Sequence, residues 1–240
     1  MQTAYEAGRL TLAHFGTVGF ELKEDASPVT IADQQAERHI RKAIESRFPG
    51  ESILGEEEGG LDTPEQWVVD PIDGTKSFVC GVPLYGTLLS FEQAGHPVIG
   101  VAYFAALDLM VAAERGLGAT ANGRFIRVSE THDLARATLC CGGHKSMENH
   151  GRLDGFQSLA RNAMATRTWG DAYGHCLVAM GKVEAMVDPV LSPWDVSAIS
   201  LIVEEAGGMC TDFEGTNNPR NQALSSNGVL HPLLLETFRS

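Results

Sequence analysis

The segment that most constrains this chain is residues 67–75, which read Trp-Val-Val-Asp-Pro-Ile-Asp-Gly-Thr. Its apolar start predicts a buried strand, and Asp70 and Asp73 follow at the end of that strand. The proline between them fixes one backbone angle, and Gly74 permits a sharp turn. Both carboxylates and the carbonyl of Ile72 can therefore face one point in space. Hard oxygen ligands that converge on a rigid turn suit a magnesium ion, so the segment predicts a metal site.

Three further acids stand where predicted secondary structure begins or ends. Residues 52–55 predict a short strand that leads directly to Glu56. Asp33 lies in the first turn of one helical pattern, and Asp195 follows Pro-Trp at the start of another. Each acid, taken alone, is more typical of a helix cap or a turn than of a functional site. Only Glu56 and Asp195, read together with Asp70 and Asp73, indicate a metal-dependent site.

The composition limits the classes of protein to which the chain can belong. Its 240 residues can form one domain or two small ones, and its formal charge of −13 argues against nucleic-acid binding, which requires basic patches. A small phosphorylated substrate is compatible with this charge, because bound metal ions reverse the local field. No apolar segment is long enough to span a membrane, and the N-terminus lacks a signal-peptide pattern. The odd number of cysteines, without a Cys-x-x-Cys pair, predicts reduced thiols in a cytoplasmic protein.

Hydrophobic patterns divide the chain into a helical start, an antiparallel middle and a mixed end. Residues 4–15 and 31–48 predict helices, and residues 85–128 predict antiparallel strands. From residue 135 onward strands and helices alternate, with one helix expected over 149–162. We therefore expect a mixed α/β fold.

We expect one unit over residues 1–240, with an N-terminal lobe of about 1–134 and a C-terminal lobe of about 135–240. Residues 116–121 fit the Gly-x-Gly-x-x-Ala form of the dinucleotide-binding fingerprint. That fingerprint requires a helix directly after it, whereas here an Asn-Gly hairpin signal follows. We therefore interpret these residues as part of a hairpin rather than as a nucleotide site.

Four short motifs occur in a fixed order: Gly-Glu-Glu, Asp-Pro-Ile-Asp-Gly-Thr, Pro-Trp-Asp and, at the end of the helix that follows, Glu-Ala-Gly-Gly. With them the sequence resembles the inositol monophosphatase family of magnesium-dependent phosphatases, from about residue 23 to about residue 208. The resemblance implies alternating layers of helices and sheets, α-β-α-β-α, and a homodimer. It also implies two or three Mg²⁺ ions in each active site.

The resemblance implies roles for matching residues of this chain. The first Mg²⁺ would be bound by Glu56, Asp70 and the Ile72 carbonyl, and the second by Asp70, Asp73 and Asp195, with Asp70 bridging. The attacking water would be oriented and deprotonated by Glu56 and the Thr75 hydroxyl. The implied catalytic residues are Glu56, Thr75, Asp33 and Lys23. Asp33 would act through a further and weaker metal. The spacing from Lys23 to Asp33 is one residue longer than in the family.

The segment over residues 168–174, Thr-Trp-Gly-Asp-Ala-Tyr-Gly, is similar to that of the histidinol-phosphate phosphatase subgroup. Asp171 adds a carboxylate where a neutral polyol needs none, and Asp188 adds a second, which suits a substrate with an ammonium and an imidazole group. Two simpler readings stay open: Asp171 caps the following helix, and the neighbouring Trp169 and Tyr173 are core residues rather than partners of an imidazole. The implied substrate-binding residues are Asp73, Gly74 and Thr75, of which the last two would hold phosphate oxygens by their backbone N–H groups, with Gly170, Asp171, Asp188 and Asp195.

The first functional hypothesis is hydrolysis of L-histidinol phosphate to L-histidinol and phosphate, in histidine biosynthesis. The alternative within the family is an inositol-1-monophosphatase or a broad sugar-phosphate phosphatase. A third hypothesis is a non-catalytic regulator on the same fold, against which the complete set of acids argues. We expect a small phosphorylated substrate and no nucleic-acid or membrane partner.

Overall fold

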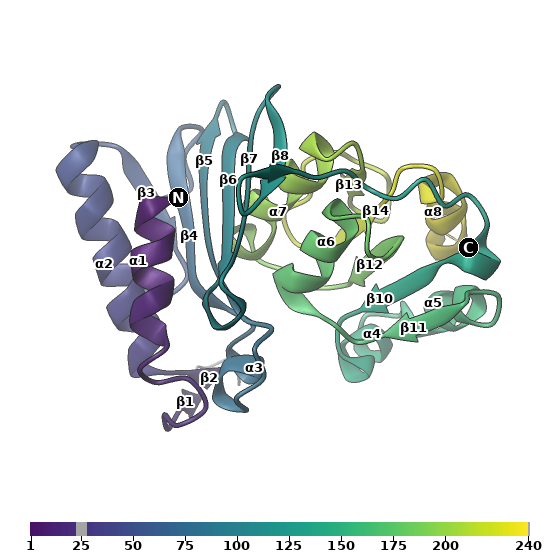
Figure 1. Ribbon diagram of the computed structural model, residues 1–240, viewed down its shortest axis with the longest axis horizontal. Helices are drawn as coiled ribbons and strands as arrows, with labels where there is room; N and C mark the ends of the chain where they lie inside the picture. Colours follow the sequence, from purple (N-terminus) through teal and green to yellow (C-terminus); the bar gives the residue numbers. More distant parts are fainter. Residues whose placement is uncertain (23–27, 240) are drawn as a thin grey trace.

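The computed structural model describes residues 1–22 and 28–239, which form five layers in the order α-β-α-β-α (Figure 1). The layered mixed α/β fold expected from the sequence is confirmed. The first layer consists of α1 (Gln2–Thr11) and α2 (Ile31–Arg47), with the short strands β1 (Glu21–Leu22) and β2 (Pro28–Val29) between them in the chain. The predicted Lys23 lies outside the described residues.

The second layer is a seven-stranded sheet in which the strands follow their chain order. Only β3 and β4 pair in parallel; the other neighbours are antiparallel, as expected for the middle of the chain. Its strands are β3 (Ser52–Gly55), β4 (Gln66–Asp73), β5 (Gly86–Gln93), β6 (His96–Phe104), β7 (Leu109–Glu114), β8 (Gly118–Ala121) and β9 (Arg124–Phe125). Residues 118–121 form β8 and continue into a hairpin, so the dinucleotide reading is excluded as predicted.

The third layer contains α6 (Asp171–Ala179) and α7 (Pro193–Glu205), which lie between the two sheets (Figure 1). Helix α7 is apolar around most of its circumference because both of its sides are covered, and residues 196–203 are all buried. It approaches β6 closely at Gly100, where an added Cβ would lie 2.6 Å from the carbonyl oxygen of Ala198. Glycine at this position lets the helix backbone touch the sheet.

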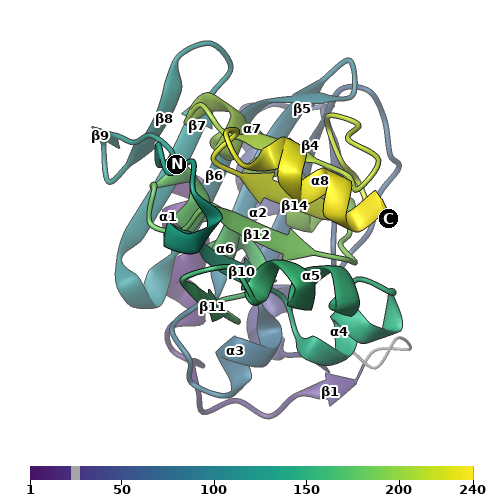
Figure 2. The same ribbon diagram turned by 90° about the vertical axis from the view of Figure 1, so that its right-hand side faces the viewer.

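The fourth layer is a five-stranded sheet with the order β11-β10-β12-β14-β13. Helices of the C-terminal half cover its outer face (Figure 2). The strands are β10 (Thr138–Cys141), β11 (Ala165–Arg167), β12 (Ala185–Asp188), β13 (Met209–Thr211) and β14 (Ala223–Ser226), and the helices are α4 (His144–Asn149), α5 (Leu153–Ala160) and α8 (His231–Arg239). One five-residue helix, α3 (Thr75–Val79), follows β4, and two 3₁₀ turns are formed by Ala105–Leu107 and Leu134–Arg136.

The helix expected over residues 149–162 is confirmed over Leu153–Ala160, but its expected start is wrong. The structure has α4 and α5 there, separated by a turn in which Gly151 has φ of 66°. The left-handed backbone at a glycine ends a helix. The periodic apolar residues continue across this break, so the pattern alone does not reveal it.

Cys80 is exposed and the other four cysteines are buried and free, as expected for reduced thiols. Among the described residues no helix is long and apolar enough to cross a membrane. The division into two lobes near residue 134 stays a prediction.

Candidate active site

The end of β4 places two carboxylates on one side of the chain. Residues three apart in a regular strand point to opposite faces. Here the pairing with β5 shifts between Asp70 and Asp73, so that β4 contains one residue more than its partner. The Oδ1 atom of Asp70 accepts a hydrogen bond from the Ile72 backbone N–H at 3.0 Å, which closes the bulge. The bulge therefore brings both acids to the same edge of the sheet.

The turn after β4 requires glycine. Gly74 has φ of 78°, and an added Cβ would lie 2.9 Å from Oδ2 of Asp171. Directly after it, the Thr75 hydroxyl donates to the Ile72 carbonyl at 3.1 Å. The turn thus holds the Ile72 carbonyl, the Thr75 hydroxyl and the carboxylate of Asp171 close together.

Asp195 joins the two β4 carboxylates from another layer. Asp70, Asp73 and Asp195 each offer one carboxylate oxygen within 4.8 Å of the others. We call these three residues the aspartate triad. Asp195 lies in the first turn of α7, where its Oδ2 accepts a hydrogen bond from the Ser192 backbone N–H at 2.6 Å. The structure therefore brings together residues that are more than 120 positions apart in the sequence.

The triad has the electrostatics of a cation site. Burial raises the pKa of Asp70 well above its usual value, and the charges of Glu56, Asp73 and Asp195 raise it further. Burial followed by the charges of Asp171 and Asp195 has the same effect on the pKa of Asp73. Burial raises the pKa of Asp195 to about 7, although its hydrogen bond from Ser192 lowers it. Two buried carboxylates and a part-buried one this close together repel one another unless a cation neutralises them, so this donor set fits a hard metal ion.

Glu56 reaches the triad from the loop after β3. Its backbone N–H donates to the Val69 carbonyl at 3.2 Å, which fixes it beside Asp70, and its charge is the largest electrostatic contribution to the raised pKa of Asp70 after burial. The next turn of this loop is held by Glu37 of α2, a fully buried carboxylate. Glu37 accepts from the backbone N–H groups of Glu57 at 2.7 Å and Glu58 at 3.1 Å.

Glu37 is a functional residue that was not predicted from the sequence. The spacing of polar residues could have indicated it. Glu37 follows Asp33 by four residues and Arg41 follows Glu37 by four, so all three lie on one face of α2. Arg41 donates to Glu37 at 2.8 Å and to the Gly59 carbonyl at 2.5 Å. This face of α2 therefore fixes the loop that carries Glu56.

Asp33 is fully buried and both caps a helix and faces the site. Its Oδ2 accepts from the Thr30 backbone N–H at 2.8 Å and from the Thr30 hydroxyl at 2.6 Å, which completes a capping box. Its Oδ1 has no hydrogen-bond partner within the described part of the chain. Burial raises the pKa of Asp33, and the charge of Glu56 raises it further. The simple reading of Asp33 as a helix-start charge is confirmed, and its second oxygen remains available to a ligand.

A pocket of about 250 Å³ opens beside the triad. Of the substrate-binding residues expected from the sequence, all except Gly170 line it: Asp73, Gly74, Thr75, Asp171, Asp188 and Asp195. Lys76, which the sequence analysis did not single out, also lines the pocket. The walls thus carry four carboxylates and one lysine, which is the chemistry of a site for a polar ligand with both positive and negative groups.

Asp171 does not cap α6, so that reading of it is wrong. The N-cap of α6 is Gly170, which makes no side-chain cap hydrogen bond, and the Ala172 N–H donates instead to Oδ2 of Asp73 at 2.9 Å. Asp171 itself has φ of 57°, a conformation that is costly for a residue with a side chain and is often found at functional sites. Its carboxylate is left to face the pocket.

Asp188 lies at the end of β12, with 7% of its surface exposed. Burial raises its pKa well above the usual value, and the charges of Asp171 and Asp195 raise it further. Burial also raises the pKa of Asp171, although the charge of Lys76 lowers it. Two carboxylates in one wall favour a ligand that brings positive charge.

The two aromatic residues near Asp171 differ in their surroundings. Tyr173 packs edge-on against Phe104, with ring centroids 5.2 Å apart, and belongs to the core as the simpler reading held. Trp169 is 40% exposed, and the Arg167 guanidinium lies 5.7 Å from its ring centroid. Neither residue lines the pocket.

Comparisons with known proteins agree with this geometry. Residues 1–240 match the inositol monophosphatase family. A histidinol-phosphatase of Chlorobaculum parvum is 41% identical over 219 residues, which cover 90% of this chain and 85% of that protein. A histidinol-phosphatase of Mycobacterium tuberculosis is 37% identical over 242 residues, 97% of this chain and 93% of that protein. Among solved structures, an IMPase of Thermotoga maritima superposes with a TM-score of 0.92 at 32% identity, covering 99% of this chain and 94% of that one.

Proposed function

This chain belongs to the inositol monophosphatase family, and from that membership and the geometry of its site we propose that it is a Mg²⁺-dependent histidinol-phosphate phosphatase. The expected enzyme class, a phosphatase, is confirmed by the family. The finer proposal is the reaction: L-histidinol phosphate and water give L-histidinol and inorganic phosphate. Cytoplasmic location and a homodimer remain part of the proposal.

The aspartate triad supports the choice of metal. Its carboxylates and the Ile72 carbonyl are hard oxygen donors, and the raised pKa values of Asp70 and Asp73 show how unfavourable their charges are without a cation. We assign Glu56, Asp70 and the Ile72 carbonyl to one Mg²⁺ and the triad to a second, with Asp33 available for a third. When bound, the metal supplies Lewis-acid activation of water and neutralises charge on the phosphoryl and leaving oxygens.

The chain's own residues then orient the attacking water. Glu56 accepts a proton from this water. The Thr75 hydroxyl, which donates to the Ile72 carbonyl at 3.1 Å in the structure, holds the water in line with the ester bond that breaks. A bond forms from the water oxygen to phosphorus as the ester P–O bond breaks, the leaving alkoxide takes a proton from solvent water, and Glu56 returns to solvent the proton that it accepted. Because water attacks directly, no side-chain nucleophile is needed.

The observation that carries the substrate assignment is Asp171. Its carboxylate faces the pocket from a left-handed residue, makes no cap, and lies in the same wall as Asp188. The ammonium group of histidinol phosphate would neutralise this pair, whereas a neutral polyol would leave its charges uncompensated. Lys76 in the same pocket suits the phosphate.

The alternative substrate is inositol-1-phosphate or a sugar phosphate. It is favoured by the similarity to the IMPase of Thermotoga maritima. The carboxylates of Asp171 and Asp188 can also accept hydrogen bonds from hydroxyl groups. The two substrates therefore differ in the positive charge that they bring to the pocket.

The test compares phosphate release from L-histidinol phosphate and inositol-1-phosphate with saturating Mg²⁺. We expect kcat/KM to favour histidinol phosphate by about tenfold or more, since a charge-assisted hydrogen bond contributes about 1.5–3 kcal/mol. Asp171→Ala should remove most of this preference. The matched control is Asp154→Ala, an exposed aspartate in the first turn of α5, which should leave both substrates unaffected. Equal or better use of inositol-1-phosphate by the unmodified enzyme would refute the histidinol-phosphate assignment.

A further inference from the structure

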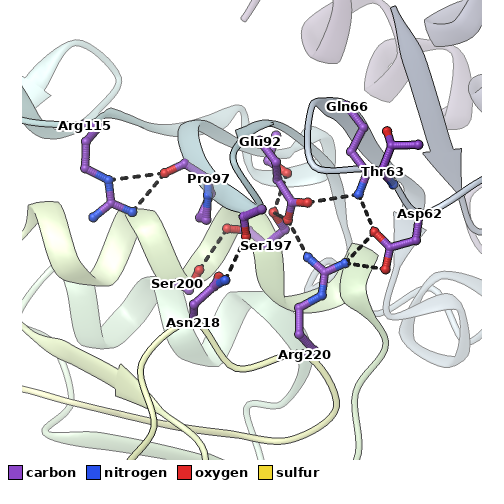
Figure 3. Close-up of polar contacts among 12 residues, drawn as sticks. Asp62, Thr63, Gln66, Glu92, Pro97, Arg115, Ser197, Ser200, Asn218 and Arg220 are labelled. Carbon is purple, nitrogen blue, oxygen red and sulfur yellow. Dashed lines mark hydrogen bonds and ion pairs between the residues drawn. The ribbon is translucent and has the colours of Figure 1, made fainter.

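A buried carboxylate lies on β5, outside the residues assigned to catalysis. Glu92 has 1% of its surface exposed and accepts hydrogen bonds from three other segments of the chain (Figure 3). The donors are Ser197 of α7 at 2.8 Å, Gln66 of β4 at 2.9 Å and Arg220 at 2.6 Å. We call Glu92, Ser197, Gln66 and Arg220 the Glu92 network. A charge buried this deeply is tolerated only with such partners.

Arg220 extends the Glu92 network to the surface. Its second guanidinium nitrogen contacts both carboxylate oxygens of Asp62, at 3.0 and 3.1 Å (Figure 3). The neighbouring Asn221 carbonyl accepts from the Leu191 backbone N–H at 2.8 Å, and Leu191 lines the pocket just before α7. The segment around Arg220 therefore holds both the sheet and the approach to α7.

Ser197 is the contact between the Glu92 network and α7. It lies two residues after Asp195, is 2% exposed, and its hydroxyl also accepts from the Ser90 hydroxyl at 2.7 Å. Ser90 pairs with Gly100, where an added Cβ would lie 2.6 Å from the Ala198 carbonyl oxygen of α7. At this point the helix can neither rotate nor slide without breaking buried hydrogen bonds.

The Glu92 network and the aspartate triad join the same two elements. Strand β4 carries Gln66 at its start and Asp70 and Asp73 at its end, and α7 carries both Asp195 and Ser197. Gln66 is the direct cross-strand partner of Glu92. Any shift of Ser197 relative to Glu92 would therefore move Asp195 relative to the β4 carboxylates.

We propose that Glu92, charge-paired with Arg220, is a positioning residue: through Ser197 it fixes α7 against β4 and so holds Asp195 in place to complete the aspartate triad. The proposal rests on the metal-binding role of the triad given above. Mutual repulsion of the three carboxylates would push Asp195 away, and the Glu92 network opposes that movement before any ion is bound. It thereby raises the affinity for Mg²⁺ by preorganising the ligands.

The test measures binding of Mg²⁺ alone, by calorimetric titration, to Ser197→Ala and to a matched control, Ser200→Ala. Ser200 is equally buried on the same helix, but its hydroxyl donates to the Ser197 carbonyl within α7. Mutation of residues that orient metal ligands directly changes metal affinity by about 10–100-fold. We expect the low end of that range because Ser197 does not contact a ligand itself but acts on Asp195 through the position of α7. Ser197→Ala should therefore raise the Mg²⁺ dissociation constant about tenfold, and Ser200→Ala should change it less than about twofold.

A second pair of variants keeps the test decisive if Ser197→Ala folds poorly. Arg220 is about a third exposed, so its replacement leaves the core intact. Arg220→Gln removes the charge that holds Glu92 and should weaken Mg²⁺ binding, whereas Arg220→Lys keeps a cation there and should restore most of the affinity. With saturating Mg²⁺, kcat for phosphate release should recover in every variant.

The outcomes separate this inference from the proposed function. Equal Mg²⁺ dissociation constants for Ser197→Ala and Ser200→Ala, with equal values for Arg220→Gln and Arg220→Lys, would overturn the positioning role while leaving the metal site intact. A lower melting temperature without a change in Mg²⁺ affinity would lead to the same conclusion. An unmodified protein that binds no Mg²⁺ would overturn the metal site and the positioning role together.

Discussion

Helices α2 and α7 begin in the same way and serve the site differently. Each has a Thr or Ser at its N-cap and an aspartate three residues later whose Oδ2 accepts from the N-cap backbone N–H, at 2.8 Å for Asp33 and 2.6 Å for Asp195. Asp195 also lies within 4.8 Å of Asp70 and Asp73, whereas Asp33 is outside that group. A cap and a ligand are therefore not competing readings of one aspartate. One carboxylate oxygen stabilises the helix, and what the other oxygen faces decides its function.

The largest effect is expected for Asp195→Asn. Asparagine keeps a carbonyl oxygen that can accept from the Ser192 N–H, so the start of α7 should stay intact. The triad loses one of its three charges, and we expect kcat for phosphate release to fall by about a thousandfold or more. The measurement is steady-state phosphate release, with circular dichroism and thermal melting to check the fold. Activity within about tenfold of the unmodified protein would show that Asp195 serves only as a cap.

Asp33→Asn makes the same change at α2 and should have a smaller effect. The hydrogen bonds from Thr30 can be kept, and Asp33 is not part of the triad. We expect a loss of about tenfold in kcat/KM, more evident at low Mg²⁺, because Asp33 would hold a further and weaker metal. A loss of kcat/KM as large as that of Asp195→Asn would show that the two aspartates contribute equally to catalysis, contrary to the difference inferred above.

Magnesium and pH should distinguish the two helix starts through stability. Burial raises the pKa of Asp195 to about 7 in the folded protein. The metal-free protein therefore loses stability as the pH rises from the pKa of Asp195 in the unfolded chain to above about 7. Bound Mg²⁺ removes this penalty, so the increase in Tm on adding Mg²⁺ should be greater at pH 8 than at pH 6, by a few degrees. Differential scanning calorimetry with and without chelator measures it. Asp195→Asn should reduce this pH dependence, to which the raised pKa values of Asp70 and Asp73 also contribute, and Asp33→Asn should reduce it less.

The sequence predicted those parts of the site that are encoded locally. Residues 67–75 contain the strand, the turn and both of its aspartates, and the helix starts at Asp33 and Asp195 are visible as capping patterns. The hydrophobic pattern predicted a mixed α/β fold, and the order of the layers was implied by the resemblance that the family motifs carry. These features depend on neighbours within a few residues, which is the range over which sequence patterns carry information.

The parts that the sequence did not predict depend on distant contacts. Glu92 and Arg220 are 128 residues apart, and nothing near either indicates that they pair. Asp171 had every local sign of a cap, yet its left-handed backbone and the contact of Asp73 with the next N–H exclude that role. Tertiary packing decides such cases, because one local hydrogen bond stabilises the chain less than the packing of the two sheets against the helices between them.

The smallest expected effect tests the part that the two helix starts share. In the α2 capping box the Thr30 hydroxyl accepts from the Ala32 N–H at 3.1 Å and donates to Asp33 at 2.6 Å. Thr30→Ala removes both bonds and should lower the free energy of unfolding by about 1 kcal/mol, measured by urea denaturation. Thr17→Ala, an exposed threonine whose hydroxyl donates to the His14 carbonyl, is the matched control and should change it by less than about 0.5 kcal/mol. Because Oδ2 of Asp33 keeps its bond from the Thr30 backbone N–H, kcat should change less than in Asp33→Asn. If Thr30→Ala instead reduced activity as much as Asp33→Asn, orientation of Asp33 by its cap, rather than its charge alone, would be what α2 contributes to the site.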